Sequence, residues 1–453
     1  MEGMQNETGM KRKSRSAPQE SQIHGYIFFW AYFFYYAAYA VFSGNAVLFL
    51  SECGFSAALC GMVTSAMLLC SLIMQPAGGY VTDTLCSTRR YLTAGILLFI
   101  LLCFCCMAEQ KNRAALIAGM ILGAGIVYPV GQLMDAWVKM SAVVLPGLRY
   151  SRIRAGGSFG FALMSIAAGQ WFRRFGWDKY FLIQAAVFML MLPLVRILPE
   201  IPPANRNLGE GKREEKEETE EKEETEETEE ARALNTGAAK RLTVWESFRM
   251  LLHNRKYMFW FLVCTIYWFS HRPIGSFLSL LVMGRGGDAG TYGNVCGAGA
   301  IFEFLCLMLI GGGTVLKFTK QRPSALMPAA LFTGILRPLC FMLFPGLLPV
   351  YAGQVLQSLS FALYYTASVE CFALSSDERI RSFSISTGLA LSSAAGTAGA
   401  NLFGGRLCDI KGPEILPLIS LSAAIVNLLL IAAAGRRSFS SRGPGMRVSL
   451  PDR

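Results

Sequence analysis

The feature that most constrains the fold is an acidic hydrophilic segment with long apolar sequence on both sides. It covers residues 199–256, and about 175 residues of apolar sequence lie on each side of it. Each flanking block divides into six apolar stretches, most of them close to the twenty residues that a helix needs to cross a bilayer. This layout predicts an all-α membrane protein with 12 transmembrane helices in two six-helix bundles.

The amino-acid composition supports a membrane protein. The 453 residues are 53% hydrophobic and only 16% charged, whereas a soluble domain carries about 25% charged residues. The net charge of +11 is spread over short loops and tails instead of one face, which argues against nucleic-acid binding. The thirteen cysteines lie mostly in apolar stretches without zinc-site spacing, so we predict neither a metal site nor a cofactor.

The predicted spans follow one another closely within each block. In chain order they cover residues 26–50, 57–81, 91–108, 114–138, 156–172, 180–198, 257–283, 291–316, 324–344, 350–374, 383–403 and 415–434. The first span is too long for the apolar part of a signal peptide, so we expect a retained helix.

The distribution of basic residues predicts the orientation. Apart from the long central segment, the connections assigned to the inside hold about 20 Lys and Arg, and those assigned to the outside hold about 8. Basic residues are retained on the cytoplasmic side, so both termini are expected there, in a bacterial inner membrane. The predicted units are a tail (1–24), a bundle (25–198), a cytoplasmic linker (199–256), a second bundle (257–434) and a tail (435–453).

The linker contains thirteen glutamates within residues 210–230 and hardly an apolar side chain. Such a segment cannot bury a core, so it is expected to be a disordered or transiently helical tether. The alternative is a cation-binding or protein-docking role.

Charged side chains inside apolar spans are costly and therefore point to function. They are Asp135, Arg154, His271, Arg272, Glu303, Arg337 and Glu370. A carboxylate that faces a cavity can take up and release a proton as access alternates. Fixed salt bridges within the membrane, or positions near the lipid headgroups, are the structural alternative.

A second candidate feature is a row of tyrosines in the first span. Tyr32, Tyr35, Tyr36 and Tyr39 share one face of the helix with Ser43. They form either an aromatic packing seam or a wall on which the ring of a solute stacks.

Two enzyme signatures are excluded. Residues 156–160 match the Gly-x-Ser-x-Gly pattern of hydrolases, but that motif needs a strand before it, and here an apolar helix runs through it. The sequence has no Walker A motif, which argues against an ATP-driven pump. We expect no enzymatic activity.

The connection after the second span resembles the signature loop of the major facilitator superfamily. That signature has a glycine, an aspartate four residues on and a terminal basic pair, matched here by Gly79, Asp83, Arg89 and Arg90. Thr84 replaces its first basic residue, and the loop has one residue too many. The resemblance implies a gating role for this loop. A weaker match to the same signature lies at residues 405–412.

A second match is more specific. Residues 152–163 resemble the start of the fifth span in the lactose permease and phenylpropionate permease branch of proton symporters. The resemblance implies substrate binding by Arg154, with Asp135 as its acidic partner, and ring stacking on Phe161. It also implies that Glu303 and Arg337 form an ion-coupling pair. The branch has a His and a Glu in the tenth span where this chain has Gln357 and Ser360, so either Glu303 or Asp135 carries the proton or the protein is an uncoupled facilitator.

Together these features predict a secondary transporter that imports a sugar, nucleoside or organic acid with a proton, as a monomer in the lipid bilayer. The candidate residues fall into a substrate group and a proton-coupling group: Tyr32, Tyr36, Asp135, Arg154, Ser158 and Phe161, and then His271, Glu303 and Arg337. Two alternatives remain: an exporter of amphipathic compounds, and a transport-inactive sensor or scaffold that signals through the acidic linker.

Overall fold

The computed structural model describes residues 22–145, 148, 150–200, 243–310 and 323–440. Most of both predicted tails, the glutamate-rich part of the linker and the end of the eighth predicted span (311–316) lie outside these residues. Within the described ranges the chain consists of helices and short connections and contains no strand. The all-α prediction is therefore confirmed.

The helices before the linker form one group. They are the first helix (Gln22–Gly44), which ends in the π-helical turn η1 (Ala40–Gly44), followed by α2 (Ala46–Glu52), α3 (Ala57–Thr84), α4 (Thr88–Ala108), α5 (Arg113–Val144), α6 (Tyr150–Phe175) and α7 (Tyr180–Ile197).

The helices after the linker form a second group. They are α10 (Val244–His253), α11 (Arg255–Ser276), α12 (Leu278–Gly284), α13 (Ala289–Ile310), α15 (Pro323–Leu343), α16 (Leu348–Leu374), α17 (Arg381–Lys411) and α18 (Leu416–Ser440), with two short 3₁₀ turns, η2 (Glu378–Ile380) and η3 (Pro413–Ile415).

Within the described ranges, each predicted span overlaps a helix or a helix pair that is broken once, the eighth span being described only up to residue 310. The breaks, at Asn45 and Phe277, divide the first and seventh predicted spans into a long and a short helix. Helix α10 was not predicted. It begins at Thr243, whose hydroxyl accepts from the backbone N–H of Glu246 while the Glu246 carboxylate accepts from that of Thr243.

The break in the first helix has a specific hydrogen-bond pattern. In a π-helical turn the backbone bonds span one residue more than in an α-helix, which leaves carbonyl groups for other partners. The carbonyl of Phe42 accepts from the Tyr180 hydroxyl at 2.8 Å, and that of Gly44 accepts from the Tyr292 hydroxyl. The second bond joins the two helix groups.

The long helices fall into two sets. Within the described ranges, seven helices are long and apolar enough to cross a membrane by composition alone. Helices α6, α11, α13, α16 and α17 are not among them. Each of these five contributes polar side chains to the cavity described below.

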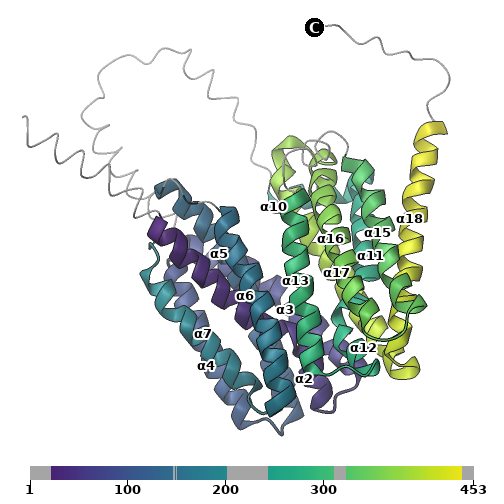
Figure 1. The fold of residues 1–453 in the computed structure, drawn as a ribbon. Coiled ribbons are helices and arrows are strands. Elements are labelled where there is room, and N and C mark those ends of the chain that lie inside the picture. Colours follow the sequence, from purple (N-terminus) through teal and green to yellow (C-terminus); the bar gives the residue numbers. More distant parts are fainter. Residues whose placement is uncertain (1–21, 146–147, 149, 201–242, 311–322, 441–453) are drawn as a thin grey trace, which may run out of the picture.

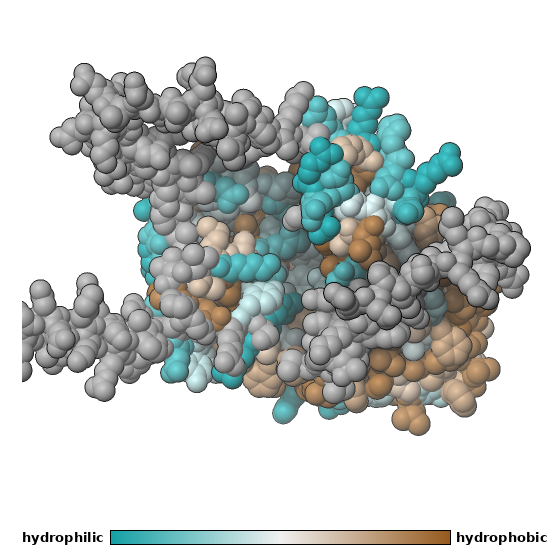
Figure 2. Space-filling view, turned by 90° about the horizontal axis from the view of Figure 1, so that it is seen from above, coloured by the Kyte–Doolittle hydropathy of each residue, from teal (hydrophilic) through white to brown (hydrophobic). Residues whose placement is uncertain are grey.

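The outer surface of the helices is apolar. Leu69 and Ile73 on α3 are 52% and 72% exposed, and Leu101 on α4 is 60% exposed. In water such a surface would be unfavourable, whereas lipid tails cover it at no cost. Figure 2, seen from the face where the linker attaches, shows hydrophobic side chains along the outer side of the second helix group and a hollow between the two groups.

The two groups meet near one face of the molecule and diverge toward the other (Figure 1). We call the face where α7 ends and α10 begins the linker face, and the opposite face, where α3 and α13 begin, the far face. Two helix pairs join the groups: α6 packs against α13, and α3 packs against α17.

Glycines bring these two pairs of helices into backbone contact. A Cβ atom at Gly169 of α6 would lie 2.6 Å from the carbonyl oxygen of Ala289, and one at Gly405 of α17 would lie 2.5 Å from that of Ala57. Both positions are close to the far face. Small residues at such contacts let the helix backbones approach closely.

Candidate functional site

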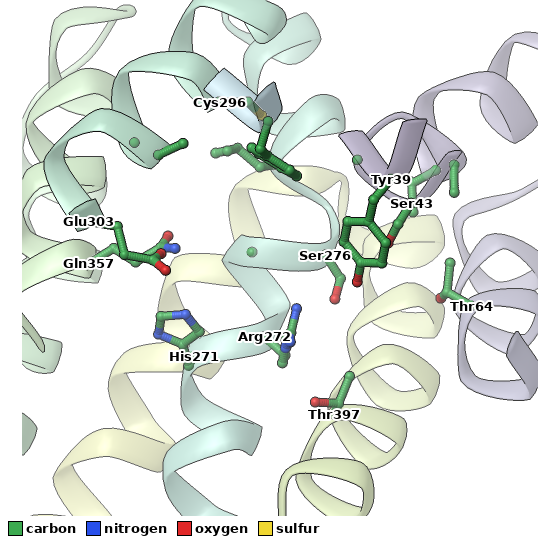
Figure 3. A pocket seen from close by; sticks show the side chains of 18 of the residues that line it. Tyr39, Ser43, Thr64, His271, Arg272, Ser276, Cys296, Glu303, Gln357 and Thr397 are labelled. Atoms are coloured by element: carbon green, nitrogen blue, oxygen red, sulfur yellow. The ribbon is translucent and has the colours of Figure 1, made fainter. Parts of the chain in front are cut away.

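A polar cavity of about 410 Å³ lies between the two helix groups. Helices of both groups line it, with most of the polar side chains on the first helix, α6, α11, α13, α16 and α17. Figure 3 shows Glu303, Gln357 and His271 gathered at one side, with Arg272, Tyr39 and Ser276 at the other. The volume suits a small organic solute.

The first helix group contributes a cation held on an aromatic ring. The guanidinium carbon of Arg154 lies 4.3 Å from the centre of the Tyr36 ring. Gly157, one turn along α6, leaves the room for this contact, since a Cβ there would lie 2.8 Å from Arg154 Nη1. Ser158 and Phe161 line the same wall. Four predicted substrate residues therefore reach the cavity: Tyr36, Arg154, Ser158 and Phe161.

The second group contributes two further basic side chains from adjacent positions of α11. The His271 ring stacks on Tyr267 with ring centres 5.6 Å apart, and Arg272 lies over the Trp268 ring at 4.8 Å. From α13, the Glu303 carboxylate faces the same space. Two of the predicted coupling residues, His271 and Glu303, thus line the cavity.

The charged groups of the cavity are near one another without being paired. Glu303 experiences the field of both Arg154 and Arg272. Yet within the described ranges no ion pair within 4.0 Å includes any of these three side chains. They remain available to a bound solute.

Tyr32 and Asp135 do not line the cavity, in contrast to the prediction. The Tyr32 side chain is fully buried, and its hydroxyl donates to Asp135 Oδ1 at 2.6 Å. The predicted direct partnership of Asp135 with Arg154 is absent from the described ion pairs. Asp135 is instead occupied by Tyr32, because the first helix and α5 pack face to face at this level.

Arg337 lies behind the cavity. It is 3% exposed and borders a small void of about 10 Å³ together with His271 and Gln357. Its Nη1 donates to the carbonyl of His271 at 3.4 Å, while its Nε and Nη2 have no partner among the described residues. The structure does not bring Arg337 into an ion pair with Glu303, since the two side chains leave α15 and α13 toward different spaces.

The residues of the predicted gating loop separate into two sets. Arg89 and Arg90 both form ion pairs with Glu200 at the end of α7, the second at 3.1 Å, and the Ser87 hydroxyl donates to the same carboxylate at 2.7 Å. These contacts lower the pKa of Glu200 through hydrogen bonds from Ser87 and Arg89. Asp83 is exposed, and a Cβ at Gly79 would meet nothing within 4 Å. In this conformation the loop is tied to its own helix group.

The cavity is closed on the far-face side by polar contacts between the groups. Asp409 at the end of α17 accepts from the backbone N–H of Ala57 at 2.7 Å and of Ala58 at 2.9 Å. Tyr292 donates to the carbonyl of Gly44, as described above. Nearby, Asn401 donates to the Thr64 hydroxyl at 3.2 Å.

Sequence reasoning did not assign several of the lining residues. The sequence identifies Arg272 only as a charge within a span and Gln357 only as a residue that replaces a His or Glu of the similar branch, yet both line the cavity. Further polar or aromatic lining residues that the sequence does not single out include Thr64, Tyr128, Ser276, Tyr292, Gln354, Thr397 and Asn401, whereas Tyr39 and Ser43 of the predicted tyrosine row do line the cavity. The one available signal was polarity inside an apolar helix, which does not show the face on which a residue lies.

Comparisons with known proteins agree with this architecture. A model of the MFS_1 like family matches residues 27–417. The sequence has no recognisable relative among the curated proteins.

Solved structures of membrane transporters share the fold at low sequence identity. The crystal structure of the nucleoside transporter NupG aligns with a TM-score of 0.71 at 14% identity, covering 91% of this chain and 98% of that one. A POT family transporter in complex with 5-aminolevulinic acid aligns with a TM-score of 0.63 at 13% identity, covering 93% and 96%. Another structure of a POT family transporter, in complex with a thioalcohol-conjugated peptide, aligns with a TM-score of 0.63 at 12% identity, covering 92% of this chain and 96% of that one. Because the family model covers most of its length, the chain belongs to the MFS_1 like family and has the major facilitator fold.

Proposed function

We propose that the protein is a secondary transporter that imports a small polar organic solute together with a proton by alternating access. The observation that carries this proposal is the 410 Å³ polar cavity between two helix groups that touch mainly near one face. A site at the level where two helix bundles meet is the arrangement that rocking of one bundle against the other exposes to each side in turn.

In this proposal the substrate is held from both groups. Arg154 binds a polar group of the solute, with Ser158 as a further hydrogen-bonding group, and Tyr36 and Phe161 stack against a ring. Asp135 and Tyr32 hold the first helix against α5 and act on the site through Tyr36. A monomer is the proposed working unit.

Glu303 is the proposed proton carrier. It is the one carboxylate on the described wall of the cavity, and it lies in the field of Arg154 and Arg272. His271 and Arg337 are proposed to tune this region from α11 and α15. The similarity to the lactose and phenylpropionate permease branch supports a coupled importer. The similarity to the nucleoside transporter NupG supports nucleosides among the predicted solutes, and the similarity to peptide transporters of the POT type adds peptides.

Orientation is part of the proposal. The excess of basic residues places the linker face in the cytoplasm, in a bacterial inner membrane, with residues 25–198 and 257–434 as the two moving bundles. The structure then corresponds to an inward-facing state, since the groups meet at the far face.

The test measures external pH in lightly buffered, energy-depleted cells while sugars, nucleosides, peptides and aromatic acids are added in turn. Import with a proton makes the medium alkaline for one class of solute. Glu303→Gln should remove this signal while solute exchange persists, and Arg154→Ala should abolish uptake at unchanged expression. Arg255→Ala, an exposed arginine outside the cavity, is the control. Normal uptake by Arg154→Ala would refute the assigned site.

An exporter is the second candidate, favoured by the aromatic side chains of the cavity. Flux directed out of the cell, with no uptake of any tested solute, would support it. Deletion of residues 210–230 separates both from a scaffold, because a transporter should keep its activity without them.

A further inference from the structure

The walls of the cavity carry more positive than negative charge. Two guanidinium groups, Arg154 and Arg272, and one carboxylate, Glu303, line it within the described ranges. Arg337 adds a third guanidinium immediately behind His271. With His271 neutral, these groups carry a net positive charge, also when Asp135, which acts on Arg154 from behind the wall, is counted with them.

None of these guanidinium groups has an acidic partner in contact. Arg272 lies over the Trp268 ring, and its Nε is buried without an acceptor among the described residues. Among the groups that act on it electrostatically, Glu303 is the acid, whereas Arg337 adds a second positive charge. Arg154 lies on the Tyr36 ring and in the field of Asp135, but the two form no ion pair among the described residues, and Asp135 accepts from Tyr32 instead.

Unpaired charge in such a place is expensive. Cations buried in a protein are normally paired, because removal from water costs several kcal/mol per ion. Glu303 and the more distant Asp135 together carry one negative charge fewer than the three guanidinium groups carry positive charges. The missing negative charge must come from the medium when the cavity is loaded.

We propose that the solute is an organic anion, whose carboxylate or phosphate group is bound between Arg154 of α6 and Arg272 of α11. This rests on the proposed transport function and names its substrate class. Guanidinium groups match such anions because two parallel N–H groups meet two oxygens. The two arginines belong to different helix groups, so the anion links the groups that must move together.

The same arrangement determines what accompanies the anion. In the empty cavity Glu303 balances one arginine. When the anion neutralises the arginines, the Glu303 carboxylate loses its favourable partners and takes up a proton. One negative and one positive charge then cross together, so transport of a monovalent anion is electroneutral.

The experiment uses purified full-length protein in detergent and pairs of ligands that share a skeleton. Benzoate is compared with benzamide, glucuronate with glucose, and uridine monophosphate with uridine. The midpoint of thermal unfolding reports binding, because a ligand of the folded state stabilises it by mass action. We expect the anionic member of at least one pair to raise the midpoint and its neutral partner to leave it unchanged.

Variants then locate the binding. Arg272→Gln should raise the anion concentration for half-maximal stabilisation by about tenfold or more. Arg272→Lys keeps the charge but not the two parallel donors and should have a smaller effect, which also guards against loss of folding in the Gln variant. Arg255→Gln makes the same change at an exposed position of the same helix and should have no effect.

The outcomes separate this proposal from the transport function. Stabilisation by an anion that Arg272→Gln removes supports the anion site, whether or not the cells show uptake. Equal binding of the neutral partners, or no stabilisation by any anion, overturns it. Uptake of a neutral solute in cells would then leave transport standing with a different substrate class.

Discussion

Removal of the Asp409 carboxylate should open the far face of the protein. Asp409 belongs to α17 in the second helix group, but its two oxygens accept from the first N–H groups of α3 in the other group. These N–H groups have no partner within their own helix, and the helix dipole favours a negative charge beside them. The local N-cap, Ser56, accepts only from Leu59. When the groups separate at this face, water replaces both bonds.

The size of the effect follows from these contacts. A capping side chain contributes about 0.5–2 kcal/mol, and a hydrogen bond to a charged group about 1.5–3 kcal/mol. The hydrogen bond from Ala58 is exposed to water, so we estimate that the two hydrogen bonds to Asp409 together stabilise the closed far face by about 1–2 kcal/mol. Asp409→Ala should therefore raise the population that is open at the far face by roughly 5- to 30-fold.

Cys296 provides a natural reporter. Its thiol lines the cavity, beyond the bond from Tyr292 to Gly44. A small, membrane-impermeant thiol reagent added outside intact cells reaches it only when the far face is open. Labelling of the peptide that contains Cys296, followed by mass spectrometry, should be roughly 5- to 30-fold faster in Asp409→Ala.

Two controls make this measurement decisive. Cys53, at the end of α2 near the far face, should be labelled at the same rate in both proteins. Asp178→Ala removes an exposed acid from another far-face loop and should leave Cys296 labelling unchanged. An unchanged Cys296 rate in Asp409→Ala would refute the reasoning.

Two more predictions test the contacts at the two faces. Gly293→Ala should wedge α6 from α13, because the new Cβ would lie 2.9 Å from the Cα of Gly169. We expect the free energy of unfolding to fall by about 1–3 kcal/mol and Cys296 to be labelled faster. In the control Gly95→Ala the new Cβ would lie 3.7 Å from the nearest atom, so neither quantity should change. At the linker face, Glu200→Gln should lower the unfolding free energy at neutral pH by at most about 1 kcal/mol, because this ion pair is partly exposed. Hydrogen bonds depress the pKa of Glu200, so its contribution is present above its unfolded pKa of about 4.3 and is lost as the pH falls through the folded pKa. Thermal unfolding of both proteins across the acid range should show curves that converge there, and a constant difference would contradict the assignment.

The helices could be predicted from the sequence because the membrane imposes length and hydropathy. The sixth span, predicted at residues 180–198, differs from α7 by one residue at its end. The breaks at Asn45 and Phe277 could not be predicted in this way, since each lies inside one long apolar stretch that continues on both sides. Helix α10 could not be predicted from hydropathy either, because it is short and its polar residues continue the hydrophilic composition of the linker.

The site was predictable only in part, because hydropathy does not show the direction of a side chain. Glu303 and Arg337 are both charges within spans, yet one faces the cavity and the other is buried behind it. Tyr32 and Tyr36 are one turn apart on the same helix, and only Tyr36 reaches the cavity. The contact between Tyr32 and Asp135 joins residues 103 positions apart, which no local pattern reveals.

The π-helical turn at the end of the first helix also restricts how this chain can change. A π-turn holds one residue more than an α-helical turn, and each residue of a helix turns the side chains by about 100°. Deletion of one residue between Ala40 and Gly44 would restore a regular helix, but it would rotate Tyr36 and Tyr39 away from the cavity or carry α2 off its contacts. Substitutions in this turn preserve the register, whereas single deletions do not. We therefore expect related chains to vary freely in sequence here while keeping the same number of residues.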